Sequence, residues 1–127
     1  EQITIYAGRG LLIELSDGPN CLVASSVEHH QRYEYQFWDT KNIFAGQIQT
    51  ETAYYQPNSD ARIPQIAQER WHDPHFNRGE SGWALRVVDS KDIVIYGAGF
   101  YSFFINYNNA CAQPTTSIKC QQRIFSV

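Results

Sequence analysis

An internal repeat constrains the fold of this 127-residue chain more than any other feature of its sequence. The segments 37–47 (FWDTKNIFAGQ) and 87–97 (VVDSKDIVIYG) share two apolar residues, an Asp, a Ser or Thr, a Lys, an Asn or Asp and an Ile, with a Gly shortly after. Because a strand–corner–strand unit can bury its apolar face only against a neighbouring unit, the repeat predicts a solenoid of stacked coils. A β-sandwich is the alternative, since only one clear pair of repeats is present.

Each copy of this repeat contains a polar corner followed by an apolar residue. An Asp at the start of the corner can cap a turn through local side-chain hydrogen bonds, and an Asn or Asp three residues later tolerates the left-handed backbone of a sharp bend. The next residue is an Ile, which we expect to begin a strand that faces inward. The two sets are Asp39, Asn42 and Ile43, and Asp89, Asp92 and Ile93.

Short runs with period-two alternation recur along the chain and are rich in Ile, Val, Tyr and Phe, which predicts a predominantly β fold. These runs are 3–7, 33–38, 84–89, 92–97 and 123–127. No window shows a convincing helical stripe. The best helix candidate, 63–71, is short and begins where Pro64 can occupy a first helical turn.

A long irregular excursion at about 52–80 interrupts the strand pattern and carries three of the five prolines. Segments of this kind between coils commonly lie over one face of a fold and shape a binding cleft. At 127 residues the chain has the size of one domain. We therefore expect a single module, 1–127, with one excursion.

Composition disfavours several classes of function. The net charge is −3 and the Lys and Arg residues are scattered, so there is no electrostatic reason to expect nucleic acid or anionic lipid as a partner. No stretch approaches the roughly 18 apolar residues that span a bilayer, and we expect no membrane segment. The segment 96–102 (YGAGFYS) lacks the third glycine and the βαβ context of a dinucleotide site, so no cofactor is expected.

Cysteine usage points to an extracellular protein. Cys111 and Cys120 bracket a polar segment with the composition of a surface loop, so we expect a disulfide between them, with two unpaired thiols as the alternative. Cys21 is left over, either buried as a small apolar residue or free to pair between chains. The chain begins with Glu1 and contains no Met, which indicates a processed product or a piece of a longer protein.

A row of alternating polar residues ends in a carboxylate at 47–51. Side chains in a strand alternate between faces, so Gln47, Gln49 and Glu51 would project together, opposite Ile48 and Thr50. Two tyrosines and a proline follow closely. Amides ending in a carboxylate beside aromatic residues are typical of a sugar-binding surface, but an ordinary solvated strand has the same pattern.

Glu51 is the candidate general acid of this row, held between apolar or aromatic neighbours so that it keeps its proton near neutral pH. The alternative is an exposed carboxylate at a strand end. Glycoside hydrolysis uses two acidic groups, or one acid with an ordered water. Glu28 lies twenty-three residues earlier, a separation that fits about one coil of a β-solenoid and would place the two segments side by side.

Aromatic residues near the excursion are candidates for contact with a sugar. We select Tyr54, Tyr55 and Trp71 because they lie in or beside it, and apolar faces of sugar rings pack well on aromatic rings. Most of the other aromatic residues are expected to pack in the core.

A metal site and a serine hydrolase site are not expected. His72 and His75 are three residues apart, but Pro74 breaks the helix that would present them together, and neither these histidines nor His29 and His30 belong to an evident ligand cluster. No G-x-S-x-G nucleophile motif is present.

Five segments carry a resemblance to a known family, in matching order and over nearly the whole chain. They are 6–14 (YAGRGLLIE), 27–37 (VEHHQRYEYQF), 48–57 (IQTETAYYQP), 92–107 (DIVIYGAGFYSFFINY) and the closing cysteine pair with 120–127 (CQQRIFSV). Together they resemble the C-terminal part of a glycoside hydrolase family 55 enzyme, one of the fungal and bacterial β-1,3-glucanases.

The resemblance implies two right-handed parallel β-helix modules side by side, with the substrate cleft between them, in a secreted enzyme several times longer than this chain. It implies hydrolysis of β-1,3-glucan such as laminarin, with inversion at the anomeric carbon. In the matching motifs the proposed general acid falls on Glu51 and a second, supporting carboxylate on Glu28. Tyr54, Tyr55 and Gln56 lie in the same cleft-lining segment.

Two departures from the family leave a second function open. The groups thought to hold the attacking water come from an N-terminal module that is absent here, and the segment 18–26 (GPNCLVASS) lacks the family's larger aromatic near Cys21. The alternative is a glucan-binding or defence protein that keeps the scaffold without the chemistry. Because a few coils expose an apolar end, we expect an oligomer or association with the missing module, with 3–8 and 10–15 near the contact.

Overall fold

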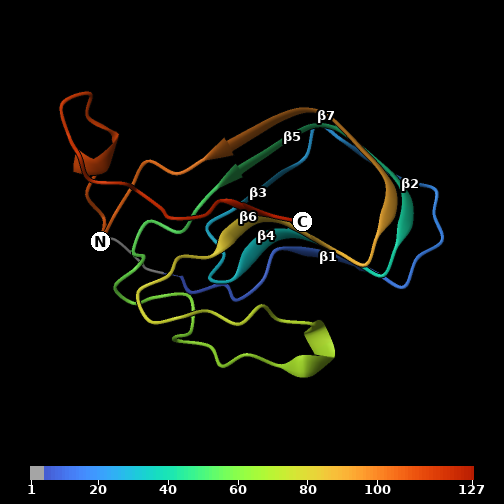
Figure 1. Cartoon of the computed structure of the whole chain (residues 1–127), viewed down its shortest axis with the longest axis horizontal. Helices are drawn as coiled ribbons and strands as arrows, with labels where there is room; N and C mark the ends of the chain where they lie inside the picture. Colours follow the sequence, from blue (N-terminus) through green and yellow to red (C-terminus); the bar gives the residue numbers. More distant parts are fainter. Residues whose placement is uncertain (1–4) are drawn as a thin grey trace.

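The structure is a computed structural model of the chain and describes residues 5–127 (Figure 1). Its strands form two parallel sheets, which confirms the all-β prediction. One sheet contains, in spatial order, β1 (Leu11–Glu14), β4 (Tyr33–Trp38), β6 (Trp83–Val88) and β8 (Phe125–Ser126). The other contains β2 (Asn20–Val23), β3 (Ser26–Glu28), β5 (Lys41–Glu51) and β7 (Lys91–Tyr101).

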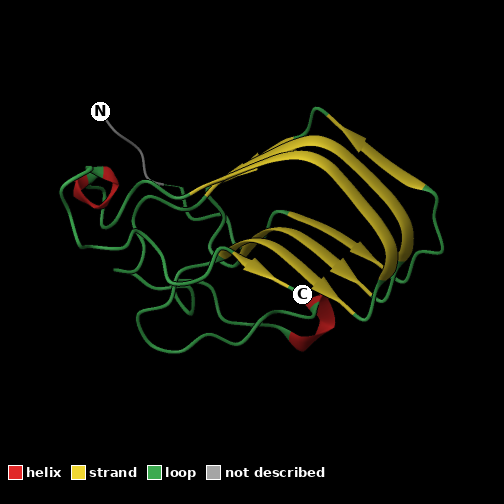
Figure 2. Ribbon diagram, turned by 45° about the horizontal axis from the view of Figure 1, so that its top comes forward, coloured by secondary structure: helices red, strands yellow, loops and turns green. Residues whose placement is uncertain are grey.

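The chain alternates between the two sheets, and its successive passes lie side by side. In the first sheet β4 pairs with β1 on one side and β6 on the other. In the second sheet β5 pairs with β2, β3 and β7, again in parallel. Figure 2 shows the two sheets facing each other across the interior. An antiparallel sandwich would instead join neighbouring strands by hairpins.

The fifty-residue repeat aligns β5 with β7 in this arrangement. The register pairs Lys41 with Lys91 and Ile43 with Ile93, which is the offset seen in the sequence. The four polar corner residues adopt positive φ angles, as their chemistry allows: Asp39 (43°), Asn42 (57°), Asp89 (48°) and Asp92 (55°). The left-handed backbone expected at Asn42 and Asp92 is therefore confirmed, whereas Asp39 and Asp89 adopt it too and make no capping side-chain hydrogen bond within residues 5–127.

A second bend, which the sequence did not reveal, divides β5 at Gln47. Its φ is 54°, and the adjacent strands bend at Ala24 and Gly97, with φ of 51° and 77°. A glycine suits this conformation, whereas Gln47 and Ala24 adopt it at a steric cost. The bend separates the first part of β5 from the last three positions, 49–51, which pair with β3.

The hydrophobic core lies between the two sheets. Side chains that alternate along each strand point inward, and each large one buried there contributes about 1.5–3 kcal/mol. The buried members are Tyr35, Phe37 and Leu85 from the first sheet and Ile43, Ala45 and Ile48 from the second.

The excursion covers the outer face of the first sheet, below β4 and β6 in Figure 1, and contains no strand. The expected helix at 63–71 is wrong except for one three-residue turn, η1 (Glu69–Trp71). The Gln65 carbonyl, which a helix would use internally, instead accepts hydrogen bonds from Gln31 Nε2 at 2.8 Å and Arg32 Nη2 at 2.5 Å. Tertiary contacts with the sheet thus replace the local helical bonds.

The two ends of the chain contain less strand than the sequence predicts. Residues 3 and 4 of the expected strand at 3–7 lie outside the described residues, and 5–7 are not in a strand. At the other end, the run 123–127 forms only the two-residue β8, paired with β6.

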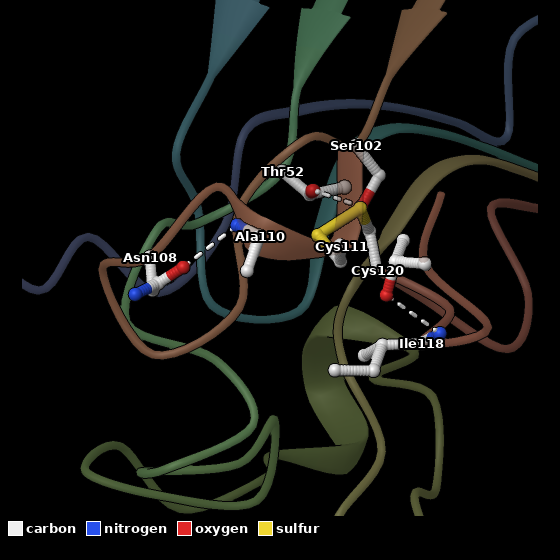
Figure 3. Close-up of a disulfide and its surroundings, with 8 residues drawn as sticks. Thr52, Ser102, Asn108, Ala110, Cys111, Ile118 and Cys120 are labelled. Carbon is white, nitrogen blue, oxygen red and sulfur yellow. Dashed lines mark hydrogen bonds between the residues drawn. A yellow bond between two sulfur atoms is a disulfide. The ribbon is translucent and has the colours of Figure 1, made fainter. Parts of the chain in front are cut away.

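The predicted disulfide is present. Cys111, in the three-residue turn η2 (Ala110–Ala112), is bonded to Cys120. Figure 3 shows it with the Thr52–Ser102 hydrogen bond, which joins the residues following β5 and β7. Cys21 is free and exposed rather than buried. Within residues 5–127 none of the helical segments is long and apolar enough to cross a membrane.

Candidate active site

The polar row at the end of β5 lies on the outer face of its sheet. Gln47 and Gln49 are exposed and Glu51 is half-buried, whereas Ile48 and Thr50, which alternate with them, are 2% and 0% exposed. The alternation expected from the sequence is confirmed. The buried side chains fix the register, and with it the outward direction of the three polar ones.

Glu28 lies beside Glu51 on the neighbouring strand β3. The parallel register pairs Glu28 with Glu51 and Ser26 with Gln49. Paired residues of adjacent strands project from the same face. The two carboxylates that are far apart in sequence therefore meet at one end of the second sheet, as their spacing suggested.

The Glu51 carboxylate is held on one of its two oxygens. Tyr54 Oη donates a hydrogen bond to Oε2 at 2.7 Å, and His29 Nε2 lies 3.2 Å from the same atom. The His29 and Tyr54 rings also contact each other, with centroids 4.2 Å apart. No hydrogen bond within residues 5–127 reaches Oε1. No sequence pattern assigned His29 to this group, and its place directly after Glu28 is the signal that could have done so.

Tyr54 is supported by two aromatic residues that follow β7. Its ring centroid is 4.4 Å from that of Phe104 and 5.9 Å from that of Phe103. Partial burial, reinforced by the hydrogen bond to Glu51, raises the pKa of Tyr54 to about 12. The phenol therefore keeps its proton at neutral pH and acts as a hydrogen-bond donor to Glu51.

The Glu28 carboxylate is also fixed through one oxygen. Its Oε1 accepts hydrogen bonds from Ser26 Oγ at 2.5 Å and from Gln49 Nε2 at 2.9 Å. Gln49, the middle member of the polar row, thus orients Glu28 while its own side chain stays exposed. Both carboxylates are anchored by neighbours on the same face.

This group also has the donor set of a cation site. One ligand atom each from Glu28, His29 and Glu51 lies within 4.8 Å of the others. Imidazole nitrogen with carboxylate oxygen suits Zn²⁺. His72 and His75, which the sequence presented as a pair, belong to no such group within residues 5–127.

Two of the residues selected from the sequence lie in the interior. Tyr55 is 4% exposed and packs edge-on against Tyr6. Gln56 is 2% exposed, and its amide is used at both ends: Nε2 donates to the Gln31 carbonyl, and Oε1 accepts from the Gly82 N–H. The structure therefore does not bring these two side chains to the open face with Glu51.

Trp71 lies in the excursion beside the first sheet. Its carbonyl accepts a hydrogen bond from Gln36 Nε2, and the Arg70 guanidinium lies over its ring. A cleft of about 340 Å³ does open next to this turn, between the excursion and the ends of β4 and β6. Neither Glu28 nor Glu51 lines it. Its lining residues are Trp38, Ala67, Gln68, Glu69, His72, Asp73, His75 and Arg86.

Several known proteins are similar to the chain in sequence. The chain is 42% identical over 130 residues to a protein of Cochliobolus carbonum named glucan 1,3-beta-glucosidase, and the match covers 99% of the chain. It is 39% identical over 131 residues to a probable glucan endo-1,3-beta-glucosidase of Arthroderma benhamiae, again over 99% of the chain. A third relative, 42% identical over 104 residues and 76% of the chain, is named non-secreted LysM effector LysM15, from Penicillium expansum.

These relatives are much longer than the chain. The matched region is 16% of the Cochliobolus protein, 14% of the Arthroderma protein and 7% of the Penicillium protein. No protein-family model matches the chain.

Proposed function

We propose that the chain is part of a β-1,3-glucan hydrolase and carries the general acid of its active site. The observation that supports this most is the pair Glu28 and Glu51, anchored side by side on an open polar face. Two relatives matched over 99% of the chain carry glucan 1,3-beta-glucosidase or glucan endo-1,3-beta-glucosidase names. A β-1,3-glucan such as laminarin is the proposed substrate.

We further propose that the two sheets are coils of a right-handed parallel β-helix, forming the C-terminal part of a glycoside hydrolase family 55 enzyme. Parallel pairing throughout the named strands and stacked corners of positive φ support this arrangement. Among the strands of residues 5–127, β1 pairs with β4 alone, so its other edge at Leu11–Glu14 is the proposed contact with a preceding module or a second copy. The disulfide supports a secreted protein.

In the proposed reaction, Glu51 donates a proton to the glycosidic oxygen. Tyr54 and His29 both approach Oε2, so the transferable proton resides on Oε1. The bond from the anomeric carbon to the protonated oxygen then breaks, and the carbon is attacked by a water that gives up one proton to the water-holding base of the longer protein. Glu51 is left as a carboxylate, stabilised by the Tyr54 hydroxyl.

Glu28 serves this reaction as a supporting carboxylate. Inverting glycosidases hold their acid and base about 6.5–9.5 Å apart, because a water must fit between base and sugar. Ligand atoms of Glu28 and Glu51 lie within 4.8 Å, which is too close for that role. The proposed inversion therefore takes its water-holding group from another part of the longer protein.

A chimaera tests the assignment of the acid. The chain replaces the matching segment of the Cochliobolus glucosidase, and glucose release from laminarin is measured. We expect Glu51→Gln to reduce the rate at least about 100-fold, whereas Glu69→Gln, on an exposed carboxylate in η1, leaves it unchanged. A chimaera in which both variants remain fully active would show that Glu51 is not the acid.

The anomer released first distinguishes the two roles of Glu28. Proton NMR should show α-glucose if the reaction inverts. Release of β-glucose would indicate retention, for which carboxylates about 5–5.5 Å apart are typical, and would make Glu28 the nucleophile.

A glucan-binding protein without catalysis is the second candidate. The match to a protein named as an effector, rather than as a hydrolase, favours it. Two results together would support this candidate over the first. Calorimetry would detect binding of laminarin to the chain, and the chimaera would release no glucose although the unmodified Cochliobolus glucosidase does.

A further inference from the structure

Two glycines of strand β7 lie beside the polar row of β5. The register pairs Gln49 with Gly99 and Glu51 with Tyr101. A Cβ at Gly97 would lie 3.6 Å from the Gln47 side chain, so a glycine flanks that residue as well. The two glycines thus have no side chain of their own next to the two glutamines.

The Tyr101 ring occupies the space above Gly99. A Cβ built on Gly99 would lie 2.8 Å from Tyr101 Cε2, 3.0 Å from its Oη and 3.1 Å from its Cζ. These separations are too short for any side chain at 99 while the ring stays in place. The ring therefore lies back along the strand over the glycine rather than standing away from the sheet.

The backbone of Tyr101 is tied to β5, and its side chain is half-exposed. Its carbonyl accepts a hydrogen bond from the Thr52 N–H at 3.1 Å, which ties it to the end of β5. The residue is 50% exposed, and its hydroxyl makes no hydrogen bond within residues 5–127. A half-exposed aromatic ring that lies over Gly99 is thus one strand away from Glu51.

We infer that Tyr101 is a stacking platform for a glucopyranose ring of the substrate, an inference that rests on the proposed function. The C–H groups on one face of a β-linked glucose form an apolar surface that matches an aromatic face. Gln47 and Gln49 lie on the adjacent strand, where their amides can bond the sugar hydroxyls at the ring's edge. Gly99 is required because only a residue without Cβ leaves room for the ring.

Other aromatic residues fit this role less well. Tyr54 is covered by His29 and Phe104, and Tyr55 is buried. Tyr96 lies on the same strand and is 75% exposed, but it pairs with Gly46, beyond the bend from Glu51. Tyr96 is therefore a matched control.

Calorimetric titration of the chain with laminaritriose tests the platform. We expect Tyr101→Ala to weaken binding about tenfold or more, Tyr101→Phe to retain it within about threefold, and Tyr96→Ala to leave it unchanged. Gly99→Ala should also weaken binding although Tyr101 is still present, because the new methyl group displaces the ring. Circular dichroism of each variant checks that the fold is kept.

Two results would overturn the inference. If Tyr101→Ala binds laminaritriose as the unaltered chain does, or if Tyr96→Ala loses as much affinity, Tyr101 is not the platform. In the chimaera, Tyr101→Ala should raise KM for laminarin more than it lowers kcat. If Tyr101→Ala changes neither KM nor kcat while Glu51→Gln still abolishes activity, the platform alone is rejected. If the unaltered chain binds no glucan and its chimaera hydrolyses none, the proposed function is rejected together with the platform.

Discussion

Strands β4 and β5 carry similar alternating patterns and place their polar residues in opposite surroundings. In β4 and the residue before it, Arg32, Glu34 and Gln36 alternate with inward aromatic residues, yet all three are at most 1% exposed. In β5 the polar row of Gln47 and Gln49 is exposed. Alternation therefore specifies which side chains leave the core, but not whether solvent or protein covers them.

The excursion accounts for this difference. Its backbone carbonyls accept hydrogen bonds from the β4 row, as at Gln65 with Arg32 and at Trp71 with Gln36. A buried polar group that is bonded in this way has a structural role. Since the excursion covers the first sheet, no such segment of residues 5–127 lies over Gln47 and Gln49, which stay exposed while Gln49 bonds Glu28. Substitutions in the two rows should therefore affect stability and function separately.

Removal of Asp73 should produce the largest loss of stability. Its carboxylate accepts hydrogen bonds from Arg9 and from the Gln68 N–H, and lies 3.5 Å from Arg32 Nε. Asp73→Ala leaves buried cations uncompensated and should lower the free energy of unfolding by about 3–5 kcal/mol, measured by urea denaturation. Asp17→Ala, which removes an exposed partner of Lys41, should change it by less than about 1 kcal/mol. Equal losses would contradict the structural role of the covered row.

The covered row should also make stability depend on pH. Burial raises the pKa of Glu34 from 4.5 to about 7, against the opposing effect of its His30 partner. The folded state therefore binds this proton more tightly than the unfolded state. The free energy of unfolding should fall by at most about 3 kcal/mol from this group as pH rises from about 4.5 to 7, and should level off above that.

Glu34→Gln isolates this contribution. The variant keeps a neutral group of the same shape, so its stability relative to the unaltered chain should improve between pH 5 and pH 8 in urea titrations. A relative stability that is constant across this range would show that Glu34 is not held in its protonated form.

The smallest expected difference in stability is between alanine variants of two glutamines, one from each row. Gln36 bonds the Trp71 and His72 carbonyls and accepts from Arg86, so Gln36→Ala should cost about 2 kcal/mol of stability. Gln49→Ala should cost less than about 0.5 kcal/mol and instead weaken laminaritriose binding, because Gln49 orients Glu28. The assignment fails if the two variants exchange these effects.

Local sequence signals predicted the repeated parts of the fold well. The sequence predicts the positive φ of a corner at Asn42 and, fifty positions later, at Asp92, and both residues adopt it. The alternation at 47–51 also indicated which side chains point outward. These features depend on neighbouring residues of the chain, and their physical cause is present in the sequence itself.

The features that failed or were missed depend on contacts between distant segments. The helix expected at 63–71 is absent because Gln31 and Arg32 bond the Gln65 carbonyl. His29 reaches Glu51 only because β3 and β5 are paired. The surroundings of Tyr101 likewise follow from the pairing of β5 with β7, which no single segment specifies.

An NMR titration of the isotopically labelled chain with laminaritriose tests the central claim most directly. The claim is that the open β5 row, and not the covered β4 row, meets the glucan. We expect shifts of the Gln47 and Gln49 side-chain amides and of the Tyr101 ring, with Gln31 and Gln36 unchanged. Shifts confined to Gln36 and to the cleft beside Trp38 would place the sugar on the other sheet and contradict the account.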